Sequence, residues 1–259
     1  MYRFLVRPKW VAFHLLVVTA IVTMVNLGFW QLRRLDQRQE FNATIEARYD
    51  EPAVPLDELL PTGAPGDPAG DSVEWRPVSV SGEYLIDETF FVVNRSQGGI
   101  AGRNVVVPLR LADGQILIVN RGFVPLATAA PEVPAGTVDL IGRLRTTQER
   151  GLGQLADPTE GDLVEVQRID IARLTDQLPG PVAPMYLDLI LSDPAEPTPY
   201  PQPVAAPELG EGNHLSYAVQ WFIFSFAVAV GWVLAVRRSA RTQQRGEGAD
   251  VDTEQLATD

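Results

Sequence analysis

Two long apolar stretches without a formal charge, one near each end of the chain, constrain its fold more than any other feature. The first is WVAFHLLVVTAIVTMVNLGFW at residues 10–30, and the second is LSYAVQWFIFSFAVAVGWVLAV at residues 215–236. A helix of about 20 residues spans about 30 Å, the thickness of the hydrocarbon layer of a bilayer. We therefore predict two transmembrane helices. The alternative, a pair of buried core helices, fits such long uncharged runs less well.

Basic residues precede the first stretch, as they do in a signal peptide. The sequence that follows it, GFWQLRR at residues 28–34, lacks the small residues of a cleavage site, which favours an uncleaved anchor. Both tails carry basic residues next to the apolar stretches, and this favours a cytoplasmic position for both termini. The arginines that follow the first stretch oppose this only locally, because long loops cross the membrane largely regardless of charge.

These patterns predict a multi-pass protein of a bacterial cell membrane. Its bacterial origin is inferred from basic residues that are almost all arginine, a coding bias of GC-rich genomes. The expected organisation is a cytoplasmic tail at 1–9, a transmembrane helix at 10–30, an extracytoplasmic β-rich domain at 31–213, a transmembrane helix at 214–236 and a cytoplasmic tail at 237–259.

The region between the two stretches has mainly strand signals. Strands are expected around Val78 and Val80 and at 89–94, 104–111, 115–124, 138–145, 162–169 and 185–192. Asp113-Gly114 predicts a hairpin with a type I′ turn. Short strands without alternating long helices predict an antiparallel domain, barrel-like or sandwich-like. The fold class is thus a membrane α+β protein.

The remaining segments of this region have other signals. Residues 33–51 are expected to continue the first helix, 51–71 to be a Pro/Gly-rich loop, and 171–178 to form a short helix capped by Asp170. The proline-rich segment 193–208 is expected to be a stiff, extended strap leading to the second apolar stretch.

Composition excludes several classes of function. The chain has no cysteine and only two histidines, His14 and His214, so a thiolate site or a multi-histidine metal site within one chain is excluded. A net charge of −12 argues against nucleic acid as a partner. No catalytic motif is present, which favours a protein that is not an enzyme. The glycine-rich segment 98–103 leads into a strand, so a hairpin loop is favoured there over a phosphate-binding loop.

Polar residues in the apolar stretches attract more interest. His214, Tyr217, Ala218 and Trp221 share one helical face, and His214 is either a ligand of haem iron or an interfacial histidine bonded to a partner or a lipid headgroup. His14 is expected near the opposite end of the helix pair, so the two histidines cannot hold one haem within one chain. A second pair is Asn26 and Gln220, which are expected at matching depths, facing each other or a partner helix. Close approach of the two helices is expected at Gly28 and Ala218.

Five spaced motifs resemble the surfeit-locus family of cytochrome c oxidase assembly factors. They are Gly28, Trp30, Gln31 and Arg34; Gly82 and Tyr84; Pro108 followed by Val119-Asn120-Arg121-Gly122-Phe123-Val124-Pro125; Gly142 to Arg145; and Asn213-His214-Leu215, Tyr217-Ala218 and Trp221-Phe222. Phe123 replaces a commoner tryptophan, and the loop from Glu51 to Asp71 is expanded.

The resemblance implies a non-enzymatic factor that helps haem a reach subunit I of the oxidase, with haem a synthase as a further partner. The alternative is a stable accessory subunit of the respiratory oxidase complex. The resemblance makes His214 the candidate haem a ligand, with Tyr217 and Trp221 beside the macrocycle. It also leaves two roles open for Arg121: pairing with an acidic neighbour in the fold, or binding a haem propionate.

Overall fold

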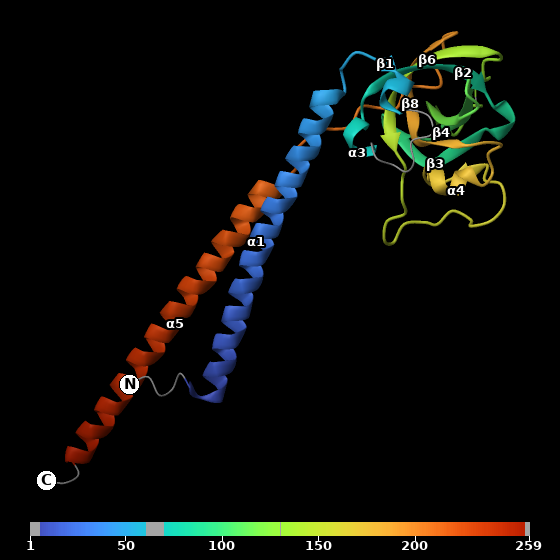
Figure 1. Ribbon diagram of the computed structural model, residues 1–259. Helices are drawn as coiled ribbons and strands as arrows, with labels where there is room; N and C mark the ends of the chain where they lie inside the picture. The colour runs from blue at the N-terminus through green and yellow to red at the C-terminus, as the bar shows by residue number, and fades with distance from the viewer. Residues whose placement is uncertain (1–5, 61–69, 130, 257–259) are drawn as a thin grey trace. The chain divides into compact units, whose positions relative to one another are not determined.

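The computed structural model describes residues 6–60, 70–129 and 131–256. The chain divides into two compact units, Met1–Ala43 with Leu209–Asp259, and Thr44–Glu208. The first unit contains the two long helices and the second contains the sheet (Figure 1).

Both apolar stretches lie in long helices. Helix α1 spans Pro8–Arg48 without interruption, so the expected continuation of the first helix past residue 30 is confirmed. Helix α5 spans His214–Leu256 and extends well beyond the predicted end at residue 236. Each contains an 18-residue window with a mean hydropathy of 2.0, and only 11% and 6% of the residues in these windows are buried. By length and composition, both helices could therefore span a membrane.

Within the first unit the two helices pack antiparallel. Three contacts define the register, because partner numbers fall on one helix as they rise on the other: Gln31 with His214, Gly28 with Phe222, and His14 with Trp232. At the middle contact, a Cβ atom on Gly28 would lie 2.7 Å from the ring of Phe222. The predicted close approach at Gly28 and Ala218 is confirmed, since both residues are buried.

The second unit consists mainly of strands, with a few short helices. In chain order its elements are β1 Val54–Pro55, α2 Leu56–Leu59, α3 Gly70–Val73, β2 Pro77–Tyr84, η2 Ile86–Glu88, β3 Phe90–Gln97, β4 Ile100–Leu111, β5 Ile116–Pro125, β6 Thr137–Thr146, β7 Glu165–Val166, α4 Ile171–Thr175 and β8 Val182–Asp193. Along β6 buried residues alternate with more exposed ones, as expected for a strand with one face on the core. All ten residues of β5 are buried, so this strand is covered on both faces.

The strands form one sheet in the order β1-β2-β6-β8-β5-β4-β3-β7, and β2 also pairs with β4. That extra pairing joins β2, β6, β8, β5 and β4 into a closed ring of paired strands. Three pairings are parallel, namely β1 with β2, β3 with β7, and β5 with β8. The sheet is therefore mixed, and the predicted antiparallel arrangement holds only for the other pairings. Strands β5 and β8 are separated by β6, β7 and α4, which gives the chain the length that a parallel pairing requires.

The turn between β4 and β5 differs from the prediction. Residues 113–114 do connect these strands, but only Gly114 has a positive φ, of 85°, and the amide of Gly114 donates to the carbonyl of Leu111. A type I′ turn needs a positive φ at both central residues. That geometry occurs instead at Gly98 and Gly99, with φ of 58° and 77°, in the two-residue connection from β3 to β4. The glycine-rich segment is thus a hairpin turn.

Two other predictions hold only in part. The strand predicted at 162–169 is reduced to β7, two residues long, because this segment pairs with β3 only at Glu165 and Val166. Within the predicted loop 51–71, residues 54–59 form β1 and α2, and Leu56 of α2 is buried in the core. Residues 61–69 lie outside the described part of the chain. The helix predicted at 171–178 is present as α4 but ends at Thr175, and the cap is confirmed, since the Asp170 side chain accepts a hydrogen bond from the Arg173 amide.

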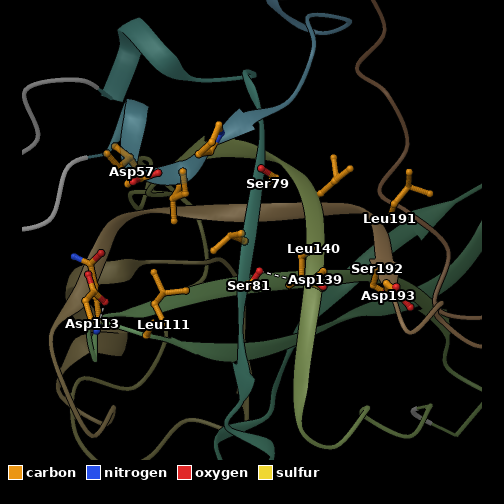
Figure 2. A pocket seen from close by; sticks show the side chains of 17 residues that line it. Asp57, Ser79, Ser81, Leu111, Asp113, Asp139, Leu140, Leu191, Ser192 and Asp193 are labelled. Atoms are coloured by element: carbon orange, nitrogen blue, oxygen red, sulfur yellow. Dashed lines mark hydrogen bonds between the residues drawn. The ribbon is translucent and has the colours of Figure 1, made fainter.

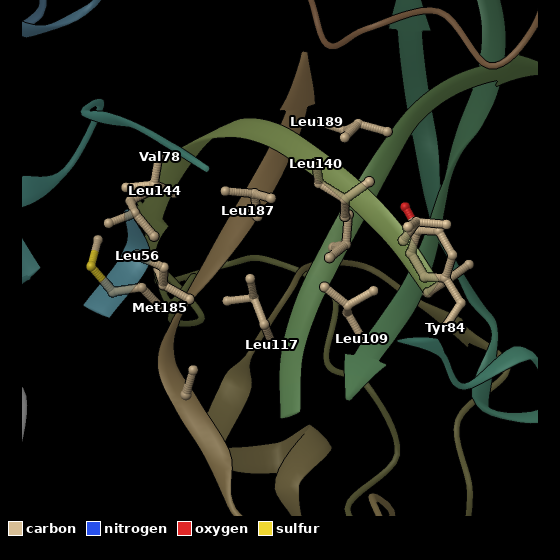
Figure 3. Packing of buried hydrophobic residues seen from close by; sticks show 14 of the residues in the cluster. Leu56, Val78, Tyr84, Leu109, Leu117, Leu140, Leu144, Met185, Leu187 and Leu189 are labelled. Atoms are coloured by element: carbon tan, nitrogen blue, oxygen red, sulfur yellow. The ribbon is translucent and has the colours of Figure 1, made fainter. Parts of the chain in front are cut away.

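Two clusters of buried apolar residues stabilise the sheet. The larger cluster contains residues from β2, β4, β5, β6 and β8, including Leu109, Leu117, Leu140 and Leu187, whose side chains converge in Figure 3. The smaller one lies under β3, β7 and α4 and includes Phe90 and Ile169. Leu56 of α2 also joins the larger cluster, so a segment with the sequence pattern of a loop contributes to the core.

The proline-rich segment after β8 contains no helix or strand between residues 194 and 208, as expected for a strap. It is tied to the sheet at Gln202, which exchanges two backbone hydrogen bonds with Phe123 of β5, of 2.7 Å and 2.9 Å. The side chain of Gln97 adds bonds to the backbone of Pro203 and Ala205. The strap is therefore a fixed part of this unit between β8 and residue 208.

Candidate functional site

His214, the residue predicted to bind haem, is the first residue of α5. The backbone carbonyl of Asn213 accepts a hydrogen bond from the amide of Tyr217, which makes Asn213 the N-cap residue. The imidazole Nδ1 of His214 lies 2.9 Å from Oε1 of Gln31 on α1. Two of the motifs noted in the sequence, far apart in the chain, therefore meet in one hydrogen bond.

The orientation of the Gln31 amide, with its oxygen toward the ring, selects the tautomer of His214 that fits this hydrogen bond. The amide oxygen of Gln31 can only accept a hydrogen bond, so Nδ1 of His214 must carry the proton and donate it. In the neutral ring the other nitrogen, Nε2, then keeps its lone pair. Histidines that bind metals almost always donate their second ring N–H to a carbonyl or carboxylate in this way. The neutral imidazole of His214 therefore has the form that a metal ligand requires.

His14 has the opposite arrangement. Its Nδ1 lies 2.9 Å from the indole nitrogen of Trp232, which can only donate, so Nδ1 of His14 is the acceptor. In the neutral ring the proton of His14 is then on Nε2, and no lone pair is left for a metal. Trp10 and Phe13 lie beside the ring at centroid distances of 5.6 Å and 6.0 Å. This chemistry favours His214 over His14 as a ligand and makes His14 a useful control.

The other predicted residues of this face differ in their surroundings. Ala218 is 1% exposed, in keeping with the close approach of the two helices. Tyr217 is half exposed. Trp221 is partly buried and makes an edge contact with Phe224, with ring centroids 6.2 Å apart. Tyr217 and Trp221 are thus accessible for contacts with a flat apolar molecule.

The remaining polar residues of α1 and α5 have other positions. Trp30 is half exposed, and Arg34 bonds within its own helix to Gln37 at 3.1 Å. Asn26 is exposed and donates to the carbonyl of Val22 in its own helix, at 2.8 Å. Gln220 is exposed as well. The prediction that Asn26 and Gln220 face each other within the chain is therefore wrong, because a bond to its own helix satisfies the Asn26 amide; a contact with a partner helix stays a prediction.

The motif Val119 to Pro125 lies on β5, and β5 pairs with β4 on one side and with β8 on the other. Gly122 pairs with Val105 while Asn120 pairs with Val106, so Arg121 is an extra residue in a β-bulge. Gly122 has a φ of 123°, and a Cβ atom there would lie 2.1 Å from the carbonyl oxygen of Gln202. Only glycine fits beside the strap at this position, and β5 continues past it to Pro125.

In this arrangement Arg121 stabilises the fold. Its guanidinium is fully buried and donates to both carboxylate oxygens of Glu196 in the strap, at 2.8 Å and 2.6 Å, and to the carbonyl of Glu132 at 2.9 Å. The expected acidic partner is therefore present. The guanidinium nitrogens that would bind a haem propionate already donate to Glu196.

A buried polar network beside Asn120 is not predicted by the sequence. The Asn120 amide donates to Asp188 at 2.7 Å, and Arg145 donates to the same carboxylate at 3.1 Å and to Glu74 at 3.2 Å. Burial raises the pKa of Asp188, with Arg145 and Asn120 opposing the shift, and burial raises the pKa of Tyr186 as well. The only signal in the sequence is the presence of acidic and amide residues at strand positions whose neighbours are apolar.

An open cleft of about 810 Å³ lies elsewhere on the sheet, between α2, β2, β6 and the end of β8. Figure 2 shows Ser79, Ser81 and Asp139 along it, and the Ser81 hydroxyl donates to the Asp139 carboxylate. None of the described residues that line this cleft is basic, so it offers an anion no favourable charge. Among the described residues, no group of three His, Asp or Glu side chains could hold a metal ion.

The fold and this site define a class of protein: a pair of long apolar helices, joined at Gln31 and His214, that precede and follow a mixed β-sheet unit in the chain. The SURF1 family model matches residues 18–226, and the chain belongs to the SURF1 family. It is 29% identical over 253 residues to an uncharacterized SURF1-like protein of Mycobacterium tuberculosis, covering 94% of this chain and 90% of the relative.

Two further relatives come from eukaryotes. A SURF1-like protein of Monosiga brevicollis is 32% identical, with 84% of this chain and 85% of the relative covered. Surfeit locus protein 1 of Homo sapiens is 28% identical, with 82% and 73% covered. The resemblance seen in the spaced motifs thus extends over most of the chain.

Proposed function

We propose that this chain is a non-enzymatic assembly factor for a haem–copper cytochrome c oxidase and that it helps haem a reach subunit I. The proposal is supported by membership of the SURF1 family together with the oxidase role that the motif resemblance implies. The observation that carries it furthest is the hydrogen bond between Gln31 and His214, because it joins two family motifs in a site suited to iron.

Haem a would be the cargo of this protein, and the residues present fit it. Its iron accepts a lone pair from an axial ligand such as a neutral imidazole. His214 would supply that lone pair through Nε2, and Gln31 would hold the ring in the required tautomer. Tyr217 and Trp221 would contact the apolar macrocycle, since both are accessible on the helical face that carries His214.

The proposal also includes a position in the cell. Both apolar helices would span the bacterial cell membrane, with the two termini in the cytoplasm and the β-rich unit outside it. A protease added to intact spheroplasts should then cut the β-rich unit. A unit that is cut only after the cells are broken would contradict this orientation.

The function is tested in a strain that lacks the gene. We expect its oxidase to show reduced haem a absorbance and reduced activity, with normal amounts of other cytochromes. Complementation with the wild-type gene should restore the haem a absorbance and the oxidase activity. The His214→Ala gene should restore neither, and the His14→Ala gene, the matched control, should restore both. A normal oxidase spectrum in the deletion strain would refute the proposal. Stoichiometric co-purification with mature oxidase would instead favour an accessory subunit.

A further inference from the structure

A cleft of about 280 Å³ lies within the β-rich unit, on the side of β6 and β8 that the strap covers. Its lining residues are Tyr49, Trp75, Arg143, Arg145, Asp188, Leu189, Ile190, Pro203, Val204, Ala205 and Pro207. Most of these side chains are apolar or aromatic. The charged groups come from two strands only, β6 and β8.

Two arginines on the same face of β6 are stacked on aromatic rings in this cleft. The guanidinium carbon of Arg143 lies 3.4 Å from the ring centroid of Tyr49, and that of Arg145 lies 3.6 Å from the ring centroid of Trp75. Stacking on an aromatic face holds a guanidinium in one plane and leaves its edges available for hydrogen bonds. The geometry therefore fixes both groups before any ligand arrives.

The two arginines differ in what their edges bind. Arg145 is neutralised by two carboxylates, those of Glu74 and Asp188. Arg143 donates through Nε to the carbonyl of Tyr49 at 3.1 Å, and within the described chain its two terminal nitrogens have neither a hydrogen-bond nor an ion-pair partner. The guanidinium of Arg143 is thus held in place by Tyr49, while its two terminal nitrogens are left for a ligand.

We propose that this cleft binds a small carboxylate with an aromatic or apolar body, through the free end of Arg143. The two terminal nitrogens of a guanidinium match the two oxygens of a carboxylate in a bidentate pair. The apolar walls, including Leu189, Val204 and Pro207, would contact the body of the ligand. This site is independent of His214 and of the proposed haem binding.

A monoanion fits the cleft better than a phosphate group. Asp188 also lines the cleft, and its carboxylate would repel a dianion more than a monoanion. Arg145 cannot compensate, since its charge is already shared between Asp188 and Glu74. Arg143, Arg145, Asp188 and Glu74 together carry no net charge, so a monoanion is favoured here over a dianion.

The test uses the full-length protein in detergent micelles and sodium benzoate as the probe, with binding measured by isothermal titration calorimetry. Benzoate should bind, and benzamide, which has the same shape without the charge, should bind at least tenfold more weakly. Arg143→Gln should weaken benzoate binding by about tenfold or more, since it removes a charge-assisted bidentate pair. Arg143→Lys, a point charge without the fork, should be intermediate.

The matched control is Arg110→Gln, which changes an exposed arginine on β4 away from this cleft and should leave benzoate binding unchanged. Far-ultraviolet circular dichroism and thermal unfolding check that each variant is folded. Absence of benzoate binding to wild type, equal binding of benzamide, or full binding by a folded Arg143→Gln variant would each overturn the inference. Inorganic phosphate that binds more tightly than benzoate would overturn the choice of a carboxylate.

Discussion

The imidazole of His214 donates from Nδ1 to the side-chain carbonyl of Gln31 across the pair of long helices, over 2.9 Å. Each residue belongs to a different motif of the sequence, and neither motif alone indicates that the two side chains meet. The bond gives Gln31 a specific task, which is to keep Nε2 of His214 unprotonated in the neutral ring.

Replacing Gln31 should therefore weaken iron binding at His214 without removing the ligand itself. We expect Gln31→Leu to lower haem retention about ten- to hundredfold, in the range seen when the partner of a metal-bound histidine is lost. Gln31→Glu keeps an acceptor and should retain haem. The measurement is the haem-to-protein ratio after purification, together with the ligand-field spectrum of the ferric form. Equal retention in Gln31→Leu and wild type would contradict this role.

A large side chain at position 28 should separate the helices. The space for a Cβ atom on Gly28 is already limited by the ring of Phe222 at 2.7 Å, so Gly28→Leu should cost about 1–3 kcal/mol of unfolding free energy. Gly231→Leu is the matched control, because Gly231 has no atom within 4 Å of the equivalent position. Denaturant titration in detergent measures both. Phe222→Ala should recover part of the loss in Gly28→Leu but not change Gly231→Leu.

The ion pair between Arg121 and Glu196 should stabilise the attachment of the strap. Glu196→Gln leaves the buried guanidinium without a charged partner, and we expect a loss of about 3–5 kcal/mol. Glu165→Gln breaks a more exposed pair with Arg103, at 3.8 Å, and should cost at most about 1 kcal/mol. Chemical denaturation of the two variants compares them directly. Equal losses would show that burial does not decide the strength of these pairs.

Asp188 should make stability depend on pH. Burial raises the pKa of this carboxyl in the folded protein above its unfolded value of about 3.9. The folded state then binds a proton more tightly than the unfolded state does, so the contribution of Asp188 to stability is full below the unfolded pKa and is lost as pH rises through the folded pKa.

The comparison with Asp188→Asn isolates this effect, because other carboxyl groups cancel in the difference. From about pH 4 upward, we expect the unfolding free energy of wild type to fall relative to that of Asp188→Asn until the folded pKa is passed. Thermal unfolding at intervals of one pH unit measures the trend. A difference that is constant with pH would show that Arg145 and Asn120 cancel the effect of burial on the pKa of Asp188, and one that rises in favour of wild type would show that they outweigh it.

The sequence predicts some features of this fold well and others poorly, for physical reasons. The apolar helices and the strands β2 to β6 and β8 are visible because their patterns are long and local. The parallel pairing of β5 with β8 is not visible, since it depends on contacts between segments far apart in the chain. Asp113-Gly114 carries the commonest signal for a type I′ turn, but Gly98-Gly99 adopts it, because turn type depends on strand register as well as on residue type.

In the candidate site, too, features with a local sequence pattern are predictable, and features that depend on distant contacts are not. His214 is recognisable as a candidate ligand from its position at the start of an apolar helix and from the motif resemblance. Its bond to Gln31 cannot be predicted, because it depends on the register of two helices whose bonded residues are 183 positions apart. The network of Asn120, Asp188 and Arg145 cannot be predicted either. Polar residues in strand segments of the sequence do not indicate which of their side chains will meet in the interior.

If His214 holds haem a through Nε2, the most direct measurement is the absorption spectrum of the full-length protein purified in detergent from cells that produce haem a. Wild type, His214→Ala and His14→Ala are compared. We predict a haem spectrum in wild type and in His14→Ala, and its loss in His214→Ala. A haem signal that persists unchanged in folded His214→Ala, or no haem in any of the three proteins, would contradict the assignment of His214 as the ligand.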